Sequence, residues 1–320
     1  MYSKKILLLF LFVAAAQGYA QIFGCTDSLS KNYRPLATQN DGSCNYSRTR
    51  IKPSFSVPLS IVLRETSSLL LWNSQLWTSN DDRDTKLYGL DTTGVIRKEI
   101  LLKKITNTDW EEMSQDSLYF YIGDFGNNAS GNRLDLHILR VEKESLAQNV
   151  QKIDTLSFSY SDQTDFRKSK SNTTDFDCEA FVVLDDSIYL FTKQWKQKKT
   201  AVYALPKTPG NHVAQLKESY NIKGLITGAT YVQDKKIIAL SGYSKRLSPF
   251  IYLLYDYNNS NFFSGNKRKI KIALPFHQVE SIATQNGRNY YLTNENFVRK
   301  PIINSPQQLH SFDLSAFLVR

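Results

Sequence analysis

Short hydrophobic runs separated by polar turns cover the chain from about residue 50 to its end. The runs are rich in Val, Ile, Leu, Tyr and Phe, and the turns are rich in Asn, Asp, Ser and Gly. No stretch has the 3.6-residue period of an amphipathic helix. This pattern predicts an all-β fold.

The runs group into five similar units. Each unit opens on a short head, usually a glutamate, that leads into a strand, a polar turn and a second strand. The heads are Glu65, Glu111, Glu179, Gly228 and Glu280, spaced by 46, 68, 49 and 52 residues. Recurrence of one β unit at this period is typical of a β-propeller. We predict five four-stranded blades, or six if the insertion at 161–174 contains strands.

Every unit but the last supplies four strands. Second strands are predicted at 75–78, 118–122, 188–191, 237–240 and 290–292, third strands at 87–90, 136–139, 202–205, 251–254 and 309–312, and fourth strands at 98–102, 153–160, 216–222 and 269–274. The last unit has no fourth strand because the chain ends soon after Phe312, but a matching strand, 55–61, precedes the first head. We expect this amino-terminal strand to close the last blade, which removes exposed sheet edges.

The first 20 residues have the composition of a secretory signal peptide. They combine two lysines, an apolar run at 6–16 and the small-residue site Gly18-Tyr19-Ala20, so cleavage is expected before Gln21. The apolar run is too short to span a membrane. We do not predict lipidation at Cys25, because a bulky phenylalanine and polar residues separate it from the run. The protein is predicted to be secreted, periplasmic or on the cell surface, with no membrane span.

Residues 21–50 form a short Asp- and Asn-rich module ahead of the propeller domain, 51–320. Cys25 and Cys44 bracket the module and are expected to form a disulfide in an oxidising compartment. So short a loop buries little apolar surface, so a disulfide must hold it. Asp27, Asn32 and Asp41 could bind calcium through oxygen, or could cap turns. The remaining Cys178 is expected to be a buried, inert thiol.

The propeller geometry predicts one shared site. The first strand of a blade starts beside the end of the second, so both open on the same face of the ring. The heads should therefore meet at one mouth of the central channel. Second-strand ends add Ser79, Asn80, Asp124, Lys193, Ser241, Tyr243, Asn294 and Glu295, and the runs 108–112, 123–128 and 175–179 are dense in oxygen ligands. The predicted acidic funnel binds its ligand through Glu65, Glu111, Glu179, Glu280, Asp124, Lys193, Asn294 and Glu295.

Carboxylates this close repel one another unless a cation, a proton or a lysine compensates them. Calcium is the candidate ion, with Glu111, Glu179 and Asp124 as ligands. Lys193 could instead pair with Glu179. In a third interpretation, each glutamate accepts backbone hydrogen bonds and ties neighbouring blades together. We predict no organic cofactor.

The chain is basic, with a formal charge of +10 that falls to +8 without the signal segment. Basic clusters lie at 167–170, 193–199 and 267–269. We interpret them as a solvated surface that discourages association of sheet edges, with a polyanion such as a phosphate-bearing glycan as the alternative. An exported chain without a nucleic-acid-binding module is not expected to bind nucleic acid.

No organised catalytic motif is present. The chain lacks G-x-S-x-G, H-E-x-x-H and Walker sequences, and His137, His212, His277 and His310 are scattered. Metal-assisted hydrolysis would not need histidine. In that case Glu111, Asp124 and Glu179 would hold metal and water, and Lys193 and Arg133 would hold an anionic oxygen.

Several short sequence segments resemble those of a family of exported bacterial β-propellers of unknown function. They are Thr108-Asp109-Trp110-Glu111, Tyr121-Ile122-Gly123-Asp124-Phe125-Gly126-Asn127-Asn128, Asp177-Cys178-Glu179-Ala180-Phe181 and Phe191-Thr192-Lys193. The likeness covers roughly residues 55–320 and extends, more distantly, to propellers labelled esterase-like phytase and to calcium-binding propellers. It implies the fold rather than a reaction. Asn127 replaces the family's usual aspartate, which weakens a multi-calcium phytase interpretation, whereas Arg133 keeps the family's arginine.

The amino-terminal module has a resemblance of its own. Its sequence is similar to short calcium-associated repeats of the thrombospondin type 3 kind. The likeness lies in Gly24-Cys25-Thr26-Asp27, Asn32-Tyr33 and Asp41-Gly42-Ser43-Cys44. Asn40 stands where such repeats usually carry another aspartate.

These residues are compatible with two functions. The leading hypothesis is a secreted binding or scaffold propeller whose acidic funnel recognises a small ligand, a glycan or a protein segment, with calcium as the candidate ion. The alternative is a calcium-dependent hydrolase of phosphate or carboxylic esters.

Overall fold

A computed structural model describes residues 21–148 and 150–318, and the predicted signal peptide lies outside the described residues. Strands account for the regular structure. Within the described ranges the only helical segments are short 3₁₀ turns: η1 (Ile61–Leu63), η2 (Lys143–Ala147), η3 (Gln233–Lys235) and η4 (Ser315–Phe317). The prediction of an all-β fold is therefore confirmed.

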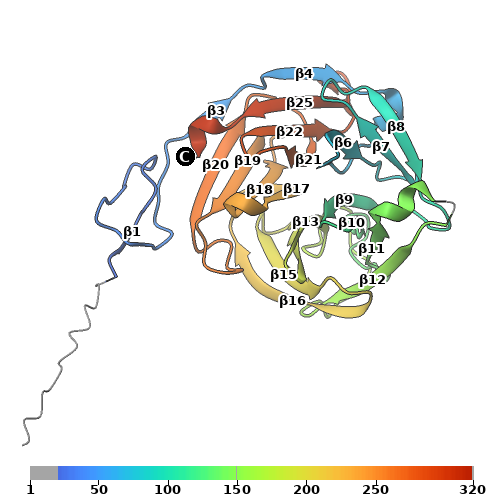
Figure 1. The fold of residues 1–320 in the computed structure, drawn as a ribbon, viewed down its shortest axis with the longest axis horizontal. Helices are drawn as coiled ribbons and strands as arrows, with labels where there is room; N and C mark the ends of the chain where they lie inside the picture. Colours follow the sequence, from blue (N-terminus) through green and yellow to red (C-terminus); the bar gives the residue numbers. More distant parts are fainter. Residues whose placement is uncertain (1–20, 149, 319–320) are drawn as a thin grey trace, which may run out of the picture.

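The strands form antiparallel four-stranded units arranged around a central axis (Figure 1). Unit 1 contains β5 (Leu70–Trp72), β6 (Gln75–Thr78), β7 (Lys86–Leu90) and β8 (Ile96–Leu101). Unit 2 contains β9 (Trp110–Gln115), β10 (Tyr119–Asp124), β11 (His137–Glu142) and β12 (Ile153–Tyr160). Unit 3 contains β13 (Cys178–Leu184), β14 (Ser187–Thr192), β15 (Thr200–Pro206) and β16 (Gly210–Tyr220).

The chain continues around the ring in the same way. Unit 4 contains β17 (Leu225–Val232), β18 (Ile237–Tyr243), β19 (Pro249–Tyr255) and β20 (Asn266–Ile272). Unit 5 contains β21 (Val279–Thr284), β22 (Asn289–Asn294), β25 (Gln308–Asp313) and β4 (Phe55–Pro58). The first strand of each unit is innermost, and β5, β9, β13, β17 and β21 contact one another in turn, with β21 returning to β5. This closed ring of radial sheets is a β-propeller.

The amino-terminal strand closes unit 5, as predicted. β4 pairs with β25 in antiparallel register, with Val57 opposite Leu309. The strand is shorter than the predicted 55–61, because it ends at Pro58 and the chain then turns through η1. Proline has no N–H to extend a sheet ladder. A segment from one end of the chain and a segment from the other therefore share one sheet.

Some edge strands were not predicted. β16 begins at Gly210 rather than near 216, and it pairs in parallel with β12, joining units 2 and 3 into one eight-stranded sheet. β3 (Thr49–Ile51) adds to β20, and β23 (Phe297–Arg299) forms a hairpin with β24 (Ile303–Ser305). Strands of two or three residues are too short to show a period of two. Residues 161–174, where a sixth blade could have been hidden, contain no strand.

The core lies between neighbouring units and is aromatic. Between units 2 and 3, Phe125 packs edge to face on Phe181, with ring centroids 5.7 Å apart. Cys178 belongs to the same cluster and is buried, which confirms its predicted packing role. Burial raises the pKa of this thiol well above its ordinary value, so it stays protonated and unreactive.

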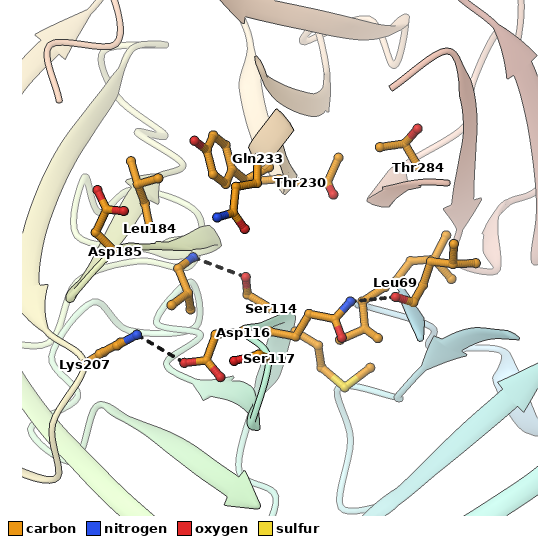
Figure 2. A pocket seen from close by; sticks show the side chains of 17 residues that line it. Leu69, Ser114, Asp116, Ser117, Leu184, Asp185, Lys207, Thr230, Gln233 and Thr284 are labelled. Atoms are coloured by element: carbon orange, nitrogen blue, oxygen red, sulfur yellow. Dashed lines mark hydrogen bonds and ion pairs between the residues drawn. The ribbon is translucent and has the colours of Figure 1, made fainter. Parts of the chain in front are cut away.

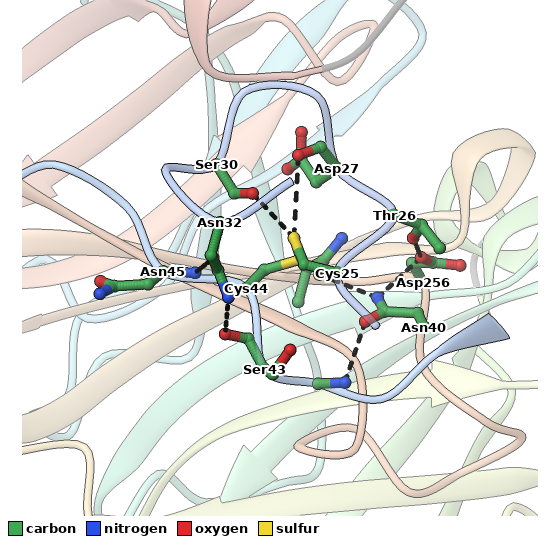
Figure 3. The surroundings of a disulfide bond; sticks show 12 residues. Cys25, Thr26, Asp27, Ser30, Asn32, Asn40, Ser43, Cys44, Asn45 and Asp256 are labelled. Atoms are coloured by element: carbon green, nitrogen blue, oxygen red, sulfur yellow. Dashed lines mark hydrogen bonds between the residues drawn. A yellow bond between two sulfur atoms is a disulfide. The ribbon is translucent and has the colours of Figure 1, made fainter. Parts of the chain in front are cut away.

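The predicted Cys25–Cys44 disulfide is present and holds the amino-terminal module (Figure 3). β1 (Phe23–Gly24) and β2 (Gln39–Asn40) form a short parallel pair inside the module. The module docks on unit 4. The buried Asp27 carboxylate accepts hydrogen bonds from the hydroxyls of Tyr46 and Tyr255, and Thr26 and Asn40 both donate to Asp256, at 2.9 and 2.7 Å.

Two basic side chains belong to this contact rather than to the solvated surface. Lys267 Nζ donates to the carbonyl of Gly42 in the module, at 3.1 Å. Arg268, in the basic cluster 267–269, is buried, and its guanidinium lies 4.7 Å from the ring centroid of Tyr46 and 5.0 Å from that of Phe317. For Arg268 the predicted exposure is therefore wrong. A cation sandwiched between aromatic faces is stabilised by their quadrupoles.

A buried hydrogen-bond chain secures the closure of unit 5. The Asn294 amide donates to the carbonyls of Glu295 and Pro306, so its Oδ1 must accept from His310 Nε2, at 2.8 Å. Burial and the neighbouring His277 lower the pKa of His310 to about 3, so the ring is neutral at pH 7. A neutral imidazole protonated on Nε2 accepts on Nδ1, and Ser56 Oγ in β4 lies 2.7 Å from that atom.

We expect His310→Ala to destabilise the protein by about 2–4 kcal/mol, because it empties a buried site and leaves Asn294 Oδ1 without its donor. Urea unfolding measures the change. The matched control is His212→Ala, whose ring bonds only a nearby carbonyl at the surface and should cost less than about 0.5 kcal/mol. Equal costs for the two variants would show that the closure does not depend on this chain.

Candidate ligand-binding mouth of the channel

One irregularity recurs in the inner strands. The ladders of β9, β13, β17 and β21 with their second strands each skip one residue, and the skipped residues are Glu111, Glu179, Thr227 and Glu280. A β-bulge of this kind leaves one residue unpaired and re-aims its side chain. In unit 1 the extra residue falls between the Thr66–Asn80 bridge and the Leu70–Trp77 pair, where Ser67 lines the same opening.

The bulges correct the predicted alignment of the heads. The position equivalent to Glu111 is Thr227 in unit 4, not Gly228, and Glu65 precedes the irregular segment of unit 1. Three glutamates therefore occupy equivalent places, not four. Each bulge falls within the first three residues of its inner strand, before most of the hydrophobic run, so the alternation along the rest of the strand does not show the shift.

The second strands contribute alternate residues. Asn80, Asp124 and Asn294 pair with the inner strand at the mouth, so their side chains and those of the next residues point to opposite sides. Thr192 and Gly242 occupy the equivalent positions in units 3 and 4. The residue after each of these positions lines the opening in four units, namely Asp81, Lys193, Tyr243 and Glu295, whereas in unit 2 it is Phe125, which packs in the core. Asp124 and Asn294, which were predicted to bind the ligand, are not among the residues that line the opening.

The opening is a cavity of about 170 Å³, which we call the acidic mouth. It is lined by Thr66, Ser67, Asp81, Asp109, Glu111, Asn128, Asn172, Glu179, Lys193, Trp195, Tyr243, Gln278, Glu280 and Glu295. Six carboxyl groups thus face one ammonium group. The predicted convergence holds for Glu111, Glu179, Glu280, Lys193 and Glu295.

Glu65 lies beside this cavity rather than in its lining. One carboxylate oxygen from each of Glu65, Asp81 and Glu295 lies within 4.8 Å of the others, and no other group of three such side chains meets this criterion in the described part of the chain. Glu65 also pairs with the exposed Arg64 at 2.8 Å. These three carboxylates form a subsite at the unit 5 to unit 1 junction, which ring closure creates.

Lys193 is the central cation of the mouth. Its side chain is buried, with the residue only 4% exposed, and Nζ lies 2.8 Å from Glu179 Oε2, so the predicted pairing is confirmed. Burial alone would lower the pKa of Lys193, but the Glu179 carboxylate raises it well above its ordinary value. The ammonium also lies 4.9 Å from the Trp195 ring centroid. Lys193 therefore belongs to the mouth, although its sequence neighbours at 196–199 form a basic loop.

Excess negative charge changes the protonation of the remaining carboxyls. Burial, with the charges of Glu295 and Glu65, raises the pKa of Asp81 to about 8. Burial and the charge of Asp177 raise the pKa of Asp109 to about 6. Burial raises the pKa of Glu280 well above its ordinary value. The mouth therefore holds protons near neutral pH, which a bound cation would displace.

One acceptor in the mouth is unused. Glu179 is 2% exposed, and its Oε1 has no hydrogen-bond partner among the described residues. A buried carboxylate oxygen without a donor is costly unless a ligand or ion satisfies it. The neighbouring backbone leaves no room for a further side chain, since a Cβ on Gly126 would clash with Glu111 Oε1.

Asp124 and Arg133 form a loop clasp outside the cavity lining. Arg133 Nη2 donates to Asp124 Oδ1 at 2.8 Å, while its other nitrogens reach Asp135 and the carbonyl of Gly126. Asp124 also accepts the N–H groups of Thr108 and Asp109, at 2.9 and 3.2 Å. This pair orders the segments that carry Asp109 and Asn128 to the mouth, so its role is positioning.

The predicted calcium ligands of the amino-terminal module are engaged in other bonds. Asp27 accepts the Leu29 N–H at 2.8 Å besides the two tyrosine hydroxyls. Asp41 accepts the Ser43 N–H, and Asn32 Oδ1 accepts the Asn45 N–H. These bonds match the alternative in which the side chains cap turns and anchor the module.

Several lining residues were not predicted from the sequence. Asp81 follows Ser79 and Asn80, the residues predicted to leave the second strand of unit 1, and alternation from Trp77 through Ser79 would have pointed to it. Gln278 precedes the fifth inner strand and donates to Glu295. Asn172 and Trp195 arrive on loops, where no periodic signal exists. Asn128 also lies on a loop, but it belongs to the oxygen-rich run 123–128 that the sequence indicated.

No protein-family model matches this chain, and no curated protein is similar to it in sequence. Among solved structures, a chain of the mitotic checkpoint complex is 10% identical, with a TM-score of 0.43, over 82% of this chain and 95% of that one. The β-propeller domain of Cps50 (Swd1) from Myceliophteria thermophila is 9% identical, with a TM-score of 0.37, over 78% and 84%. These likenesses do not bear on function.

The closed ring of inner strands places this chain in the class of β-propeller proteins. One end of its central channel carries the acidic mouth. Within the described ranges no helix has the length and apolarity needed to cross a membrane.

We expect ionisation of the Asp81 carboxyl to reduce stability as the pH rises from about 4 to 8 in metal-free buffer. Asp81 has a pKa of about 8 in the folded protein and about 3.9 when unfolded. The folded state therefore binds more protons than the unfolded state in this window, and their stabilising effect is lost on ionisation. Asp81→Asn should flatten the decline by about 1 kcal/mol or more, as measured by urea unfolding at several pH values.

The control for this measurement is Asp234→Asn, on the exposed surface, which should leave the decline unchanged. Wild-type and Asp81→Asn stabilities that change in parallel between pH 4 and 8 would contradict the assignment.

Proposed function

We propose that this chain is a binding propeller whose acidic mouth holds a hard divalent cation, calcium being the leading candidate, for ligand recognition. We take the five four-stranded units as its five blades. The observation that carries the proposal is the charge imbalance of the mouth, six carboxyl groups around one lysine, in a cavity of about 170 Å³.

The size of the mouth supports an ion rather than a whole organic molecule. Pockets for drug-sized ligands usually measure about 300–1,000 Å³, whereas this cavity is about 170 Å³. An ion with its waters fits such a volume. A larger ligand, whether a small molecule, a glycan or a protein segment, would remain outside and reach in with a single group.

The oxygen spacing also supports a calcium ion. Calcium takes six to eight oxygens at about 2.3–2.6 Å, so ligands on opposite sides of the ion are about 5 Å apart. The carboxylates of Glu65, Asp81 and Glu295 approach one another within 4.8 Å. Glu179 Oε1, buried and without a donor among the described residues, offers a further ligand across the cavity. Glu111 and Glu280 supply additional negative charge.

No observation favours the hydrolase over the binder. A hydrolase would need Arg133 and Lys193 to hold an anionic oxygen. Arg133 is held by Asp124 and Asp135 outside the lining, and Lys193 pairs with Glu179. The hydrolase remains a second hypothesis that the same variants test.

Secretion also remains a proposal. It is supported by the disulfide at Cys25–Cys44, which fits an oxidising compartment. We propose that the amino-terminal module acts as a docked brace on unit 4, and that its resemblance to calcium-associated repeats reflects its turns rather than a metal site.

We expect calcium to raise the melting temperature of the purified protein. Calcium at a hundredfold excess over Kd contributes about 2.7 kcal/mol, which corresponds to several degrees. Asp81→Asn combined with Glu295→Gln should abolish this rise, yet leave the metal-free melting temperature unchanged or higher, because the substitutions remove like-charge repulsion.

A second variant and a control sharpen this experiment. Glu111→Gln combined with Glu179→Gln tests the ligands predicted from the sequence and should reduce the calcium response, whereas Glu99→Gln, in an exposed pair with Lys86, should preserve it. Absence of any calcium response in the wild type would sink the proposal. If the wild type hydrolyses p-nitrophenyl phosphate or p-nitrophenyl acetate and Glu111→Gln combined with Glu179→Gln abolishes that turnover, the hydrolase hypothesis replaces the binding hypothesis.

A further inference from the structure

The opposite mouth of the channel contains a second and larger cavity of about 550 Å³ (Figure 2). It lies at the carboxyl ends of the inner strands, among Leu71, Ser114, Leu184, Thr230 and Thr284, whereas the acidic mouth lies at their amino ends. We infer that this neutral mouth is a second binding site, for an uncharged polyhydroxylated ligand such as a sugar residue. The inference does not rest on the function proposed for the acidic mouth.

The two mouths are separated by a buried carboxyl group. Glu112 is fully buried and follows Glu111 of the acidic mouth. It accepts the N–H groups of Met113 at 2.9 Å and of Ala229 at 2.8 Å. Ala229 belongs to β17, which is not a neighbour of β9 in the ring, so Glu112 connects two units across the channel. Met113 and Ala229 themselves line the neutral mouth, so Glu112 lies directly beneath its floor.

The volume suits a small organic ligand. A cavity of about 550 Å³ falls inside the range of about 300–1,000 Å³ that is usual for such sites. The acidic mouth, at about 170 Å³, falls below it. The two ends of one channel therefore differ in what they can admit.

The charges of the neutral mouth are nearly balanced. Lys207 Nζ lies 3.3 Å from Asp116 Oδ2, and Asp116 also accepts the N–H groups of Leu118 and Tyr119 at 2.9 Å. Asp185, at the exposed rim, is the remaining charged side chain of the lining. A free anion would therefore find no unpaired cation in this lining, and a cation would find only the solvent-exposed carboxylate of Asp185.

The remaining polar groups can donate and accept hydrogen bonds. Within the described ranges, the side chains of Ser117, Thr230 and Gln233 make no hydrogen bond to another protein group, and the Gln233 side chain points into the opening (Figure 2). Ser114 Oγ accepts from the Val183 N–H at 3.3 Å, which leaves its own hydrogen free to donate.

Apolar groups lie between these polar ones. Leu71, Leu184 and the ring of Tyr231 complete the wall. A sugar ring presents hydroxyl groups at its edge and C–H groups on its faces, so it matches a wall that mixes amide and hydroxyl groups with aliphatic and aromatic surface. An aliphatic ligand would leave the amide and hydroxyl groups unpaired.

The test is titration calorimetry and saturation-transfer NMR of the whole protein with cellobiose, lactose and N,N′-diacetylchitobiose at millimolar concentration. We expect at least one of these sugars to bind. Thr230→Trp, which fills the cavity from a half-buried position, should abolish binding, and Gln233→Ala should weaken it about tenfold, as expected for loss of one hydrogen bond.

Matched controls separate this site from the acidic mouth. Glu111→Gln should leave sugar binding unchanged, and Thr230→Trp should keep the wild-type calcium response. If Thr230→Trp does not fold, the exposed Gln233→Ala decides the matter. No binding of any of the three sugars, or binding that both neutral-mouth variants retain in full, would overturn the inference.

Discussion

Closure of the ring is the constraint on which the rest of the molecule depends. β4 comes from the start of the described chain and pairs with β25 near its end, and this places β21 beside β5. Both mouths of the channel exist only because the inner strands meet around one axis. The subsite of Glu65, Asp81 and Glu295 lies at this junction. The neutral His310 joins the closing strand, through Ser56, to Asn294, the residue next to Glu295.

The acidic mouth results from two local rules applied in several units. A bulge re-aims Glu111, Glu179 and Glu280 at the start of three inner strands, and alternation along the second strands turns Asp81, Lys193 and Glu295 toward the same space. The resulting repulsion is only partly relieved by Lys193 and by protons. In the function that we propose, calcium and protons compete for the same oxygens.

The two ends of the channel have different chemistry because their strands end differently. At the amino ends the chain carries carboxylates and the cavity is small, and at the carboxyl ends it carries hydroxyl, amide and aliphatic groups around a larger space. Glu112 lies between them, and burial raises its pKa well above the ordinary value, while bonds from the Ala229 and Met113 N–H groups act in the opposite direction. One ring of strands thus carries two mouths of unlike chemistry.

Hydrophobic periodicity along the chain was sufficient to predict the all-β class, the strands of each unit and the closing segment, because each depends on a repeated local pattern. The Cys25–Cys44 pairing could be predicted because the two cysteines bracket a short module. The meeting of Glu111 with Glu179 and Lys193 could be predicted from the ring that the repeats imply. Folding alone decided the rest. One-residue bulges moved the equivalent head from Gly228 to Thr227, and loop contacts paired Asp124 with Arg133 outside the cavity lining. Asp27 meets Tyr255 across 228 residues of chain, a contact that no local pattern encodes, since it arises where two separately formed surfaces pack.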